Sequence, residues 1–320
     1  MTKDLEPAPA VNPEFRTYVD AAGHQFEYAL IHHRGSDGLV VHLSAFFGPD
    51  DRHRVNRDQH LGYFHRLRML GSDSAHDWLF LCDTFGAHHN GTYYSGEAGD
   101  LFVERAMLEI VGTVLAERGH GPERVVTVGS SAGGHGALVL GLRLHTAGIV
   151  AISPHVDLDV AARLCGRYDE VAFACADGDP ASPGNYPVTR RIGTLLGSWP
   201  PDSELPRLFV QTVRDDVGVY GEQVLPLVES WRSHGGAVEL DVRVTGGHDA
   251  QYATRPLLMD AVARILAGRP IDVGSYQDDP AFAATVLRRP FSLRFRRRLR
   301  LRTRYRALAR RLGRPGAPLH

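Results

Sequence analysis

Short apolar runs separated by polar or glycine-rich loops recur along most of the chain. The first three are LVVHLSAFFG, WLFLCDTFG and RVVTVGSS, at residues 39–48, 78–86 and 124–131. Further runs of the same kind lie at 148–153, 207–213 and 238–244. Runs of this length, rich in β-branched residues and bounded by glycine, are typical of strands that are buried on both faces of a parallel sheet.

Apolar residues recur at helical spacing between these runs. Residues 100–118 place Leu101, Val111 and Leu115 on one helical face, and Asp100 is a candidate N-cap. Further helices are expected over 132–144, 221–233 and 253–266. Regular alternation of strands and helices implies right-handed crossovers, so the pattern predicts an α/β fold with a doubly wound, mostly parallel sheet.

Two segments depart from this alternation. Near the N-terminus, FRTYVD and HQFEYALIHH flank the turn signal AAG, which predicts a β-hairpin. Residues 155–206 carry Pro, Gly and Asp clusters with weak periodicity, which indicates a small lid or insertion over the carboxyl edge of the sheet, where open α/β sheets bind ligands. We therefore divide the chain into a leader (1–14), one domain (15–270) and a linker with an arginine-rich tail (271–320).

Composition fits a globular protein and shows an uneven distribution of charge. The 320 residues are 43% hydrophobic and carry a net charge of −1, but residues 288–320 hold 13 arginines and no acid. No segment approaches the length of a membrane span, so a cytoplasmic protein is expected. The three cysteines lack zinc-ligand spacing and are expected to be reduced, mostly buried thiols: Cys82, Cys165 and Cys175.

The stretch VVTVGSSAGGHGAL carries the strongest chemical signal. Gly129-Ser130-Ser131-Ala132-Gly133 fits the pattern G-x-S-x-G with Ser131 in the centre, between a predicted strand and a predicted helix. Ser130 cannot be central, because Val128 stands where the first glycine would be needed. Such a turn displays a serine hydroxyl at a helix N-terminus, where the Ala132 amide can face a developing oxyanion. Ser131 is therefore the candidate nucleophile.

A nucleophilic serine needs a base and an orienting acid, and both candidates follow later strands. Asp215 and Asp216 come directly after the run at 207–213, and His248 comes after the run at 238–244 in the sequence Gly-Gly-His. The carboxyl ends of these strands share the sheet edge at which Ser131 is displayed. The chain order Ser, Asp, His is the order found in α/β-hydrolases.

On these motifs, residues 15–268 resemble the α/β-hydrolase superfamily, which implies an eight-stranded sheet and a serine-dependent acyl hydrolase or acyltransferase of esterase type without a cofactor. Asp215 is the preferred acid, since the family's acid stands about two residues past its strand, and Asp216 is the second choice. The resemblance implies a second oxyanion donor in the loop after the run that contains His42, at the Phe46 or Ala45 amide. This chain has Ser44-Ala45 where the family has His-Gly.

Three further stretches, DTFGAHHNGTYYSG, GYFHRLRML and AISPHVDL, resemble α/β-hydrolase-like proteins of capsular and other cell-surface polysaccharide biosynthesis. This resemblance implies a small-molecule or glycan ester as substrate. Aromatic and polar side chains of the first stretch would then bind a sugar: Tyr93, Tyr94, His88, His89 and Asn90. The alternative is a loop whose aromatic residues pack locally, and no metal is expected from the adjacent histidines. A non-catalytic, membrane-associated partner of a polysaccharide-assembly complex is the competing function.

The basic tail at 291–314 has an apolar stripe at helical spacing within a surface of arginines. This pattern favours a helix that lies on an anionic membrane face, which would place the protein peripherally at the inner membrane. Binding of nucleic acid is the less favoured function. A solvated tail that touches the acidic remainder of the chain is the structural alternative. The oligomeric state is not predicted.

Overall fold

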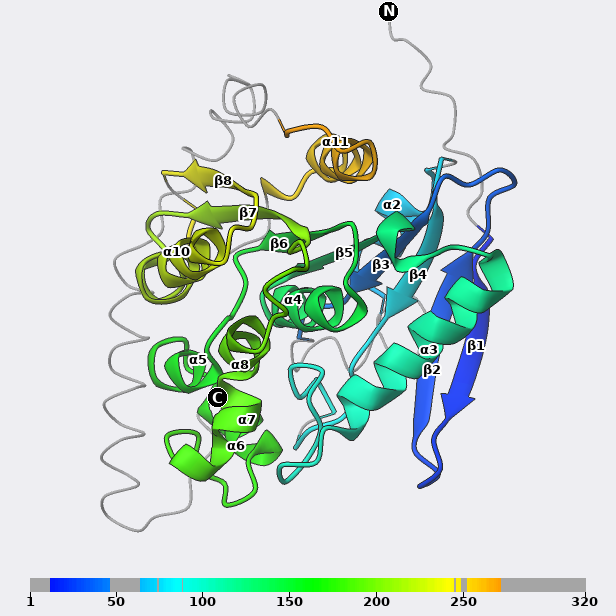
Figure 1. Cartoon of the computed structure of the whole chain (residues 1–320). Coiled ribbons are helices and arrows are strands. Elements are labelled where there is room, and N and C mark those ends of the chain that lie inside the picture. The colour runs from blue at the N-terminus through cyan, green and yellow to red at the C-terminus, as the bar shows by residue number, and fades with distance from the viewer. Residues whose placement is uncertain are drawn as a thin grey trace, which may run out of the picture.

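The computed structural model describes residues 12–46, 64–73, 75–87, 89–244, 246–248 and 252–271. Within these residues one sheet has eight strands in the order β1-β2-β4-β3-β5-β6-β7-β8 (Figure 1). The strands are β1 (Glu14–Val19), β2 (Gln25–Ile31), β3 (Leu39–Leu43), β4 (Asp77–Leu81), β5 (Val125–Ser130), β6 (Gly148–Ile152), β7 (Arg207–Val213) and β8 (Val238–Arg243). Every strand expected from the apolar runs is present.

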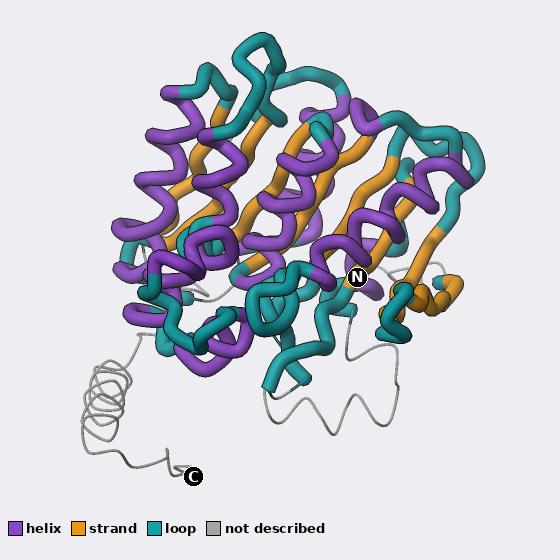
Figure 2. Tube along the Cα trace, turned by 60° about the horizontal axis from the view of Figure 1, so that its bottom comes forward, coloured by secondary structure: helices purple, strands orange, loops and turns teal. Residues whose placement is uncertain are grey.

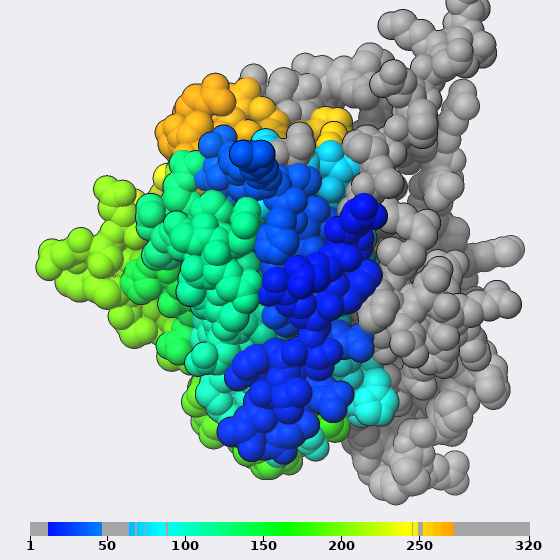
Figure 3. Space-filling view, turned by 90° about the vertical axis from the view of Figure 1, so that its right-hand side faces the viewer, coloured from blue at the N-terminus to red at the C-terminus, as the bar shows by residue number. Residues whose placement is uncertain are grey.

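The sheet is parallel from β4 to β8 and antiparallel at its N-terminal edge. β1 pairs with β2 and β2 with β4 in antiparallel register, while all the other neighbours pair in parallel. The expected hairpin is therefore β1–β2, and it lies on the molecular surface beside α3 (Figure 3). This topology confirms the predicted doubly wound, mostly parallel sheet of eight strands.

Helices cover both faces of the sheet (Figure 2). They are α2 (Leu67–Leu70), α3 (Phe102–Arg118), α4 (Ala132–Leu144), α5 (Leu158–Leu164), α6 (Tyr168–Ala174), α7 (Tyr186–Thr189), α8 (Arg191–Gly197), α9 (Val217–Val219), α10 (Leu225–Ser233) and α11 (Arg255–Leu266). Short 3-10 turns η2 (Pro122–Arg124) and η3 (Pro183–Asn185) and a π-helical turn η4 (Tyr220–Val224) join them. One face packs against α3, α4, α8 and α10, and the opposite face packs against α2 and α11.

Side-chain alternation along the strands produces these two cores. In β3, Val41 faces the α4 side, whereas Val40 faces the α11 side. Helix α4 lies at the centre of the first core, and its residues from Ala132 to Leu142 are all buried. Its glycines permit this depth, because a Cβ at Gly136 would meet the Tyr94 ring.

The structure differs from expectation at two helix starts. Asp100 does not cap α3, because the N-cap position is Leu101 and the Asp100 carboxylate pairs with Arg105. The helix expected from residue 221 begins as the π-turn η4 and becomes α-helical at Leu225. Pro226 has no amide hydrogen for the preceding turn, which favours the wider winding there.

The weakly periodic segment 155–206 contains helices α5 to α8, which gather at one end of the molecule (Figure 1). Residues of α5 and α6, among them Leu158 and Val171, pack with Ala132 and Tyr93. No helix in the described ranges is long and apolar enough to cross a membrane. The predictions for the arginine-rich tail, residues 288–320, and for most of the leader concern residues outside those ranges.

Candidate active site

Ser131 occupies the turn between β5 and α4, as the motif predicts. Its backbone has φ 55° and ψ −117°, a left-handed conformation that non-glycine residues adopt at a cost of about 1–3 kcal/mol. Three backbone hydrogen bonds hold it there. Its N–H donates to the Ile152 carbonyl (2.9 Å), and its own carbonyl accepts the N–H groups of His135 (3.1 Å) and His155 (3.3 Å).

Gly129 and Gly133 allow the strand and the helix to pass at backbone contact. A Cβ on Gly129 would collide with the Gly133 carbonyl, and a Cβ on Gly133 would collide with the carbonyls of Leu43 and Ser44. Backbone atoms of β5 and α4 cannot yield as flexible side chains can. The glycine spacing is therefore a steric requirement of the turn and also brings the loop after β3 against the helix start.

His248 and Asp216 complete a chain of hydrogen bonds that starts at Ser131. Ser131 Oγ lies 2.8 Å from His248 Nε2, and His248 Nδ1 lies 2.7 Å from Asp216 Oδ2. The three residues follow β5, β8 and β7, so they meet at the carboxyl edge of the sheet. The expectation that Ser131 and His248 come together agrees with this geometry.

The preferred candidate acid, Asp215, contacts the loop after β8, whereas the second choice, Asp216, contacts His248. Asp215 accepts the backbone N–H groups of Gly247 (2.7 Å) and Gly246 (3.3 Å), so its carboxylate is turned toward the loop after β8. Asp216 instead reaches the imidazole of His248. Asp215 therefore binds the loop that carries His248, and Asp216 contacts the ring of His248.

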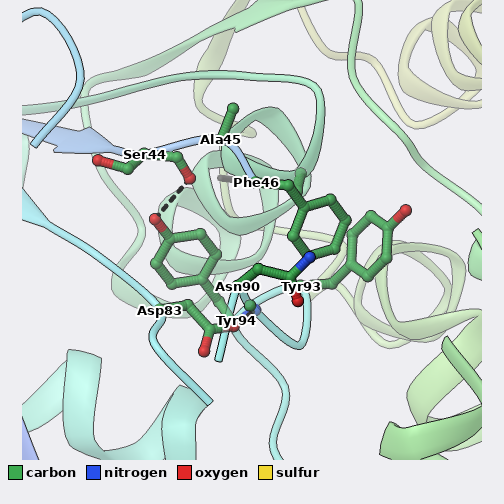
Figure 4. A pocket seen from close by; sticks show the side chains of 9 residues that line it. Ser44, Ala45, Phe46, Asp83, Asn90, Tyr93 and Tyr94 are labelled. Carbon is green, nitrogen blue, oxygen red and sulfur yellow. Dashed lines mark hydrogen bonds between the residues drawn. The ribbon is translucent and has the colours of Figure 1, made fainter. Parts of the chain in front are cut away.

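The loop after β3 lies beside the start of α4 and lines a narrow pocket (Figure 4). The pocket is lined by Ser44, Ala45, Phe46, Asp83, Asn90, Gly91, Tyr93, Tyr94 and Ala132. The Ala45 N–H donates to His65 Nδ1 at 3.2 Å, which occupies this candidate oxyanion donor. Of the two amides named from the sequence, Phe46 is therefore the better candidate.

Tyr93 and Tyr94 line the pocket, but both rings are buried, with 1% and 2% of their surface exposed. Tyr94 donates its hydroxyl to the Ser44 carbonyl at 2.8 Å, and Tyr93 places its hydroxyl 2.9 Å from His155 Nδ1. Burial raises the pKa of both phenols well above the ordinary value. Both tyrosines are therefore held among neighbouring residues, and their role in sugar binding stays a prediction.

The carboxylate of Asp83 holds the loop after β4, which carries Tyr93 and Tyr94, against the protein interior. Its buried carboxylate accepts the Thr92 and Tyr94 amides and the Thr92 hydroxyl. Burial raises the pKa of this carboxyl, while the backbone hydrogen bonds oppose the shift. Tyr93 and Tyr94 both have φ 60°, so the backbone folds tightly around the acid.

The polar residues of the same loop have different surroundings. Asn90 lines the pocket, and its buried Oδ1 has no hydrogen-bond partner among the described residues. His89 is exposed and is not among the residues that line the pocket. His88 lies outside the described residues. Among the described members of the predicted sugar-binding set, Asn90 therefore lines the pocket with a buried, unpartnered oxygen, and His89 faces solvent.

His155, a residue that the sequence reasoning did not single out, lies against the imidazole of His248. The two rings are nearly parallel, at 12°, with centroids 4.9 Å apart. His155 follows β6 in the stretch AISPHVDL and is 1% exposed. Its position after a central strand at the carboxyl edge was the available signal. His135, in the first turn of α4, is also buried and packs edge-on against Tyr93.

Ser130 points to the opposite face of the sheet from α4. Its hydroxyl accepts a hydrogen bond from Arg66 at 3.2 Å, and the same guanidinium nitrogen lies 3.4 Å from His42 Nε2. Burial lowers the pKa of Arg66 to about 10. Ser130 therefore supports the strand end and does not face His248. Within the described ranges, no group of three or more His, Cys, Asp or Glu residues is arranged to hold a metal ion.

No protein-family model and no curated protein sequence matches the chain. Solved structures do match. The capsule O-acetyltransferase of Neisseria meningitidis serogroup A superposes with a TM-score of 0.56 at 17% identity, over 76% of this chain and 96% of that one. A fluorophosphonate-binding serine hydrolase of Staphylococcus aureus, FphF, gives 0.56 at 12% identity, over 80% and 98%.

This chain has the α/β-hydrolase fold. A third structure with this fold is part of the glycosylation-associated Gap123 complex of Streptococcus agalactiae, with a TM-score of 0.56 at 17% identity. The match covers 79% of this chain and 45% of that protein, so this chain spans less than half of that protein's length. At identities of 12% to 17%, the likeness to these structures shows the fold.

Proposed function

We propose that this protein is a serine-dependent acyl hydrolase or acyltransferase in which Ser131 is the nucleophile, His248 the general base and Asp216 the orienting acid. The observation that carries the proposal is the continuous chain of hydrogen bonds from Ser131 Oγ through both ring nitrogens of His248 to Asp216. A serine hydroxyl with a base and an acid in this arrangement is activated for attack on an ester carbonyl.

In the first half of the reaction, Ser131 Oγ attacks the acyl carbonyl while its proton passes to His248 Nε2. Asp216 accepts the Nδ1–H hydrogen bond and stabilises the imidazolium that forms. The imidazolium then gives its proton to the departing alcohol oxygen, and the acyl group stays on Ser131. In the second half, water or an acceptor hydroxyl loses a proton to His248, takes the acyl group and restores the free serine.

Two backbone amides are proposed to bind the negative oxygen of the tetrahedral intermediate. The Ala132 amide belongs to the first turn of α4, where the helix dipole favours negative charge. The Phe46 amide lies in the loop that Gly133 brings against this helix start, and both residues line the same pocket. Loss of one such donor costs roughly 10²–10³-fold in rate in other serine enzymes.

Labelling with a fluorophosphonate probe tests this proposal directly. The wild-type protein is expected to label and to hydrolyse p-nitrophenyl acetate, and Ser131→Ala is expected to abolish both. Ser130→Ala is the matched control, because the adjacent hydroxyl bonds Arg66 and not His248. Absence of labelling in the folded wild-type protein, or full activity in Ser131→Ala, would falsify the assignment.

The acceptor is proposed to be the hydroxyl of a glycan, as in cell-surface polysaccharide biosynthesis. Support comes from the fold of the meningococcal capsule O-acetyltransferase, one structure of which contains CoA, and from Asn90 with an unpaired polar atom in the pocket. Incubation with acetyl-CoA or p-nitrophenyl acetate, with and without capsular oligosaccharides, separates the outcomes by mass spectrometry. Acetylated sugar indicates transfer, whereas free acetate alone indicates hydrolysis.

The Gap123 neighbour favours one rival function, a non-catalytic partner of a glycosylation or polysaccharide-assembly complex. In that case the serine would remain unlabelled by the fluorophosphonate while the fold stayed intact. The same labelling experiment, combined with circular dichroism, therefore decides between the enzyme and the partner.

A further inference from the structure

His155 covers one face of the imidazole of His248. The ring centroids lie 4.9 Å apart and the ring planes differ by 12°, so the contact is face to face. About a third of the His248 side chain is exposed, while 1% of His155 is exposed. His248 is therefore the partly exposed member of this stack, and His155 is the buried one.

Three hydrogen bonds hold His155 in place. Its backbone N–H donates to the Ser131 carbonyl at 3.3 Å, and its carbonyl accepts Nδ1–H of His135 at 3.0 Å. Its ring Nδ1 lies 2.9 Å from the Tyr93 hydroxyl. The position of the His155 ring is thereby linked to the same turn that displays the nucleophile.

Protonation of His155 is disfavoured within this stack. Burial lowers the pKa of His155 well below the ordinary value, and the charges of His248, Arg167 and His135 oppose its protonation further. Tyr93 is the remaining titratable group against its ring. Around His248, Asp216 faces Nδ1, Ser131 faces Nε2 and His155 faces the ring plane. His155 is therefore neutral when His248 becomes an imidazolium.

We propose that His155 is a positioning residue whose neutral ring fixes the orientation of His248 and stabilises its imidazolium form. The inference rests on the proposed function, since the imidazolium forms when His248 takes the proton of Ser131. An aromatic face attracts a cation stacked on it, and the attraction is stronger where water is excluded. Packing against the buried ring also limits rotation of a side chain that is otherwise open to solvent.

Two substitutions at His155 separate the effect of an aromatic ring from the effect of filling the buried space. His155→Phe keeps an aromatic face, and His155→Leu fills much of the space without one. In p-nitrophenyl acetate hydrolysis, His155→Leu is expected to lower kcat roughly 5- to 30-fold with KM little changed. The acidic limb of its pH–rate profile is expected to move to lower pH, because the imidazolium is less stable. His155→Phe is expected to retain the position of that limb and most of kcat.

A titration of the His248 ring protons by NMR measures the same effect without substrate. The midpoint is expected to fall in His155→Leu and to stay near the wild-type value in His155→Phe. Equal midpoints in all three proteins would overturn the inference. Failure of the wild-type protein to label with fluorophosphonate would instead overturn the proposed function, while the NMR comparison would still decide the role of His155.

A second variant covers the case in which His155→Leu does not fold. Tyr93→Phe removes the hydroxyl that meets His155 Nδ1 and leaves both stacked rings in place. The midpoint of the His248 titration is expected to fall in Tyr93→Phe, but by less than in His155→Leu, because the His155 ring is less firmly held. An unchanged midpoint together with unchanged kcat would contradict the anchoring role.

Discussion

His248 Nδ1 lies 2.7 Å from Asp216 Oδ2, whereas the neighbouring carboxylate of Asp215 binds the backbone of Gly246 and Gly247. The two aspartates therefore differ in what their loss should do. Asp216→Asn should lower kcat by roughly 10³–10⁴-fold, because the amide no longer holds the productive tautomer or stabilises the imidazolium. Steady-state hydrolysis of p-nitrophenyl acetate measures this effect.

Asp215→Asn is the matched control for that variant. It should cost about 1–3 kcal/mol in the free energy of unfolding, measured by urea denaturation, because the hydrogen bonds to Gly246 and Gly247 are weakened. Its effect on kcat should be much smaller than that of Asp216→Asn. A larger loss of kcat in Asp215→Asn would contradict the assignment of the acid.

Glycine-to-alanine substitutions test the steric argument for the turn at Ser131. Gly129→Ala should destabilise the fold by about 3 kcal/mol or more, because the added Cβ meets the Gly133 carbonyl. Gly112→Ala is the control: this exposed glycine within α3 has open space, and alanine there should stabilise the protein by about 0.5–1 kcal/mol. Thermal melts measure the expected loss of stability in Gly129→Ala and the expected gain in Gly112→Ala. A Gly129→Ala protein as stable as wild type would refute the steric requirement for glycine at this turn.

Tyr94→Phe tests whether this tyrosine is a structural residue. The change leaves the buried Ser44 carbonyl without its 2.8 Å partner and should cost about 1–3 kcal/mol, with KM for a glycan substrate unaffected. Tyr18→Phe is a suitable comparison, since the Tyr18 hydroxyl has no hydrogen-bond partner among the described residues and its loss should change stability little. A raised KM at unchanged stability in Tyr94→Phe would instead assign the hydroxyl to substrate.

Buried histidines should make the protein sensitive to mild acid. Burial lowers the pKa of His135 to about 4, so between this value and about 6.5 the unfolded chain binds a proton that the folded chain does not. Stability therefore falls as the pH drops through this window, by on the order of 3 kcal/mol for His135 alone. The pKa values of His42 and His155 are lowered in the same direction and add to the loss.

Urea denaturation at several pH values across this window measures the slope. His135→Asn keeps a donor near the Nδ1 position for the His155 carbonyl but removes the titratable ring, so its stability should depend less steeply on pH. A slope identical to that of wild type would show that the acid sensitivity has another origin.

The fold and the position of the nucleophile could be read from the sequence because each depends on local patterns. Apolar runs identified β3 to β8, the turn signal AAG identified the hairpin β1–β2, and helix α4 was expected at the residues where it occurs. The turn at Ser131 was predictable because Gly129 and Gly133 are required by contacts of neighbouring backbone. In these cases one short segment contains both the signal and its cause.

The orienting acid and the contents of the pocket depended on contacts that the sequence does not encode locally. Asp215 and Asp216 are chemically identical, and the loop after β8 determines which of them faces His248. The sequence left open whether the loop rich in polar residues and tyrosine binds a sugar or packs locally, and the buried carboxylate of Asp83, which accepts the Tyr94 amide, could not be foreseen. Both outcomes required the tertiary structure.

The burial of α4 from Ala132 to Leu142 also limits how this part of the sequence can vary among related proteins. Each of its glycines that meets a neighbour, such as Gly136 against Tyr94 or Gly141 against Ile149, accepts a larger residue only if that neighbour shrinks at the same time. Exchange at these positions should therefore occur as paired changes. In an alignment of homologues, residues 132–142 should diverge more slowly than the solvent-facing side of α3.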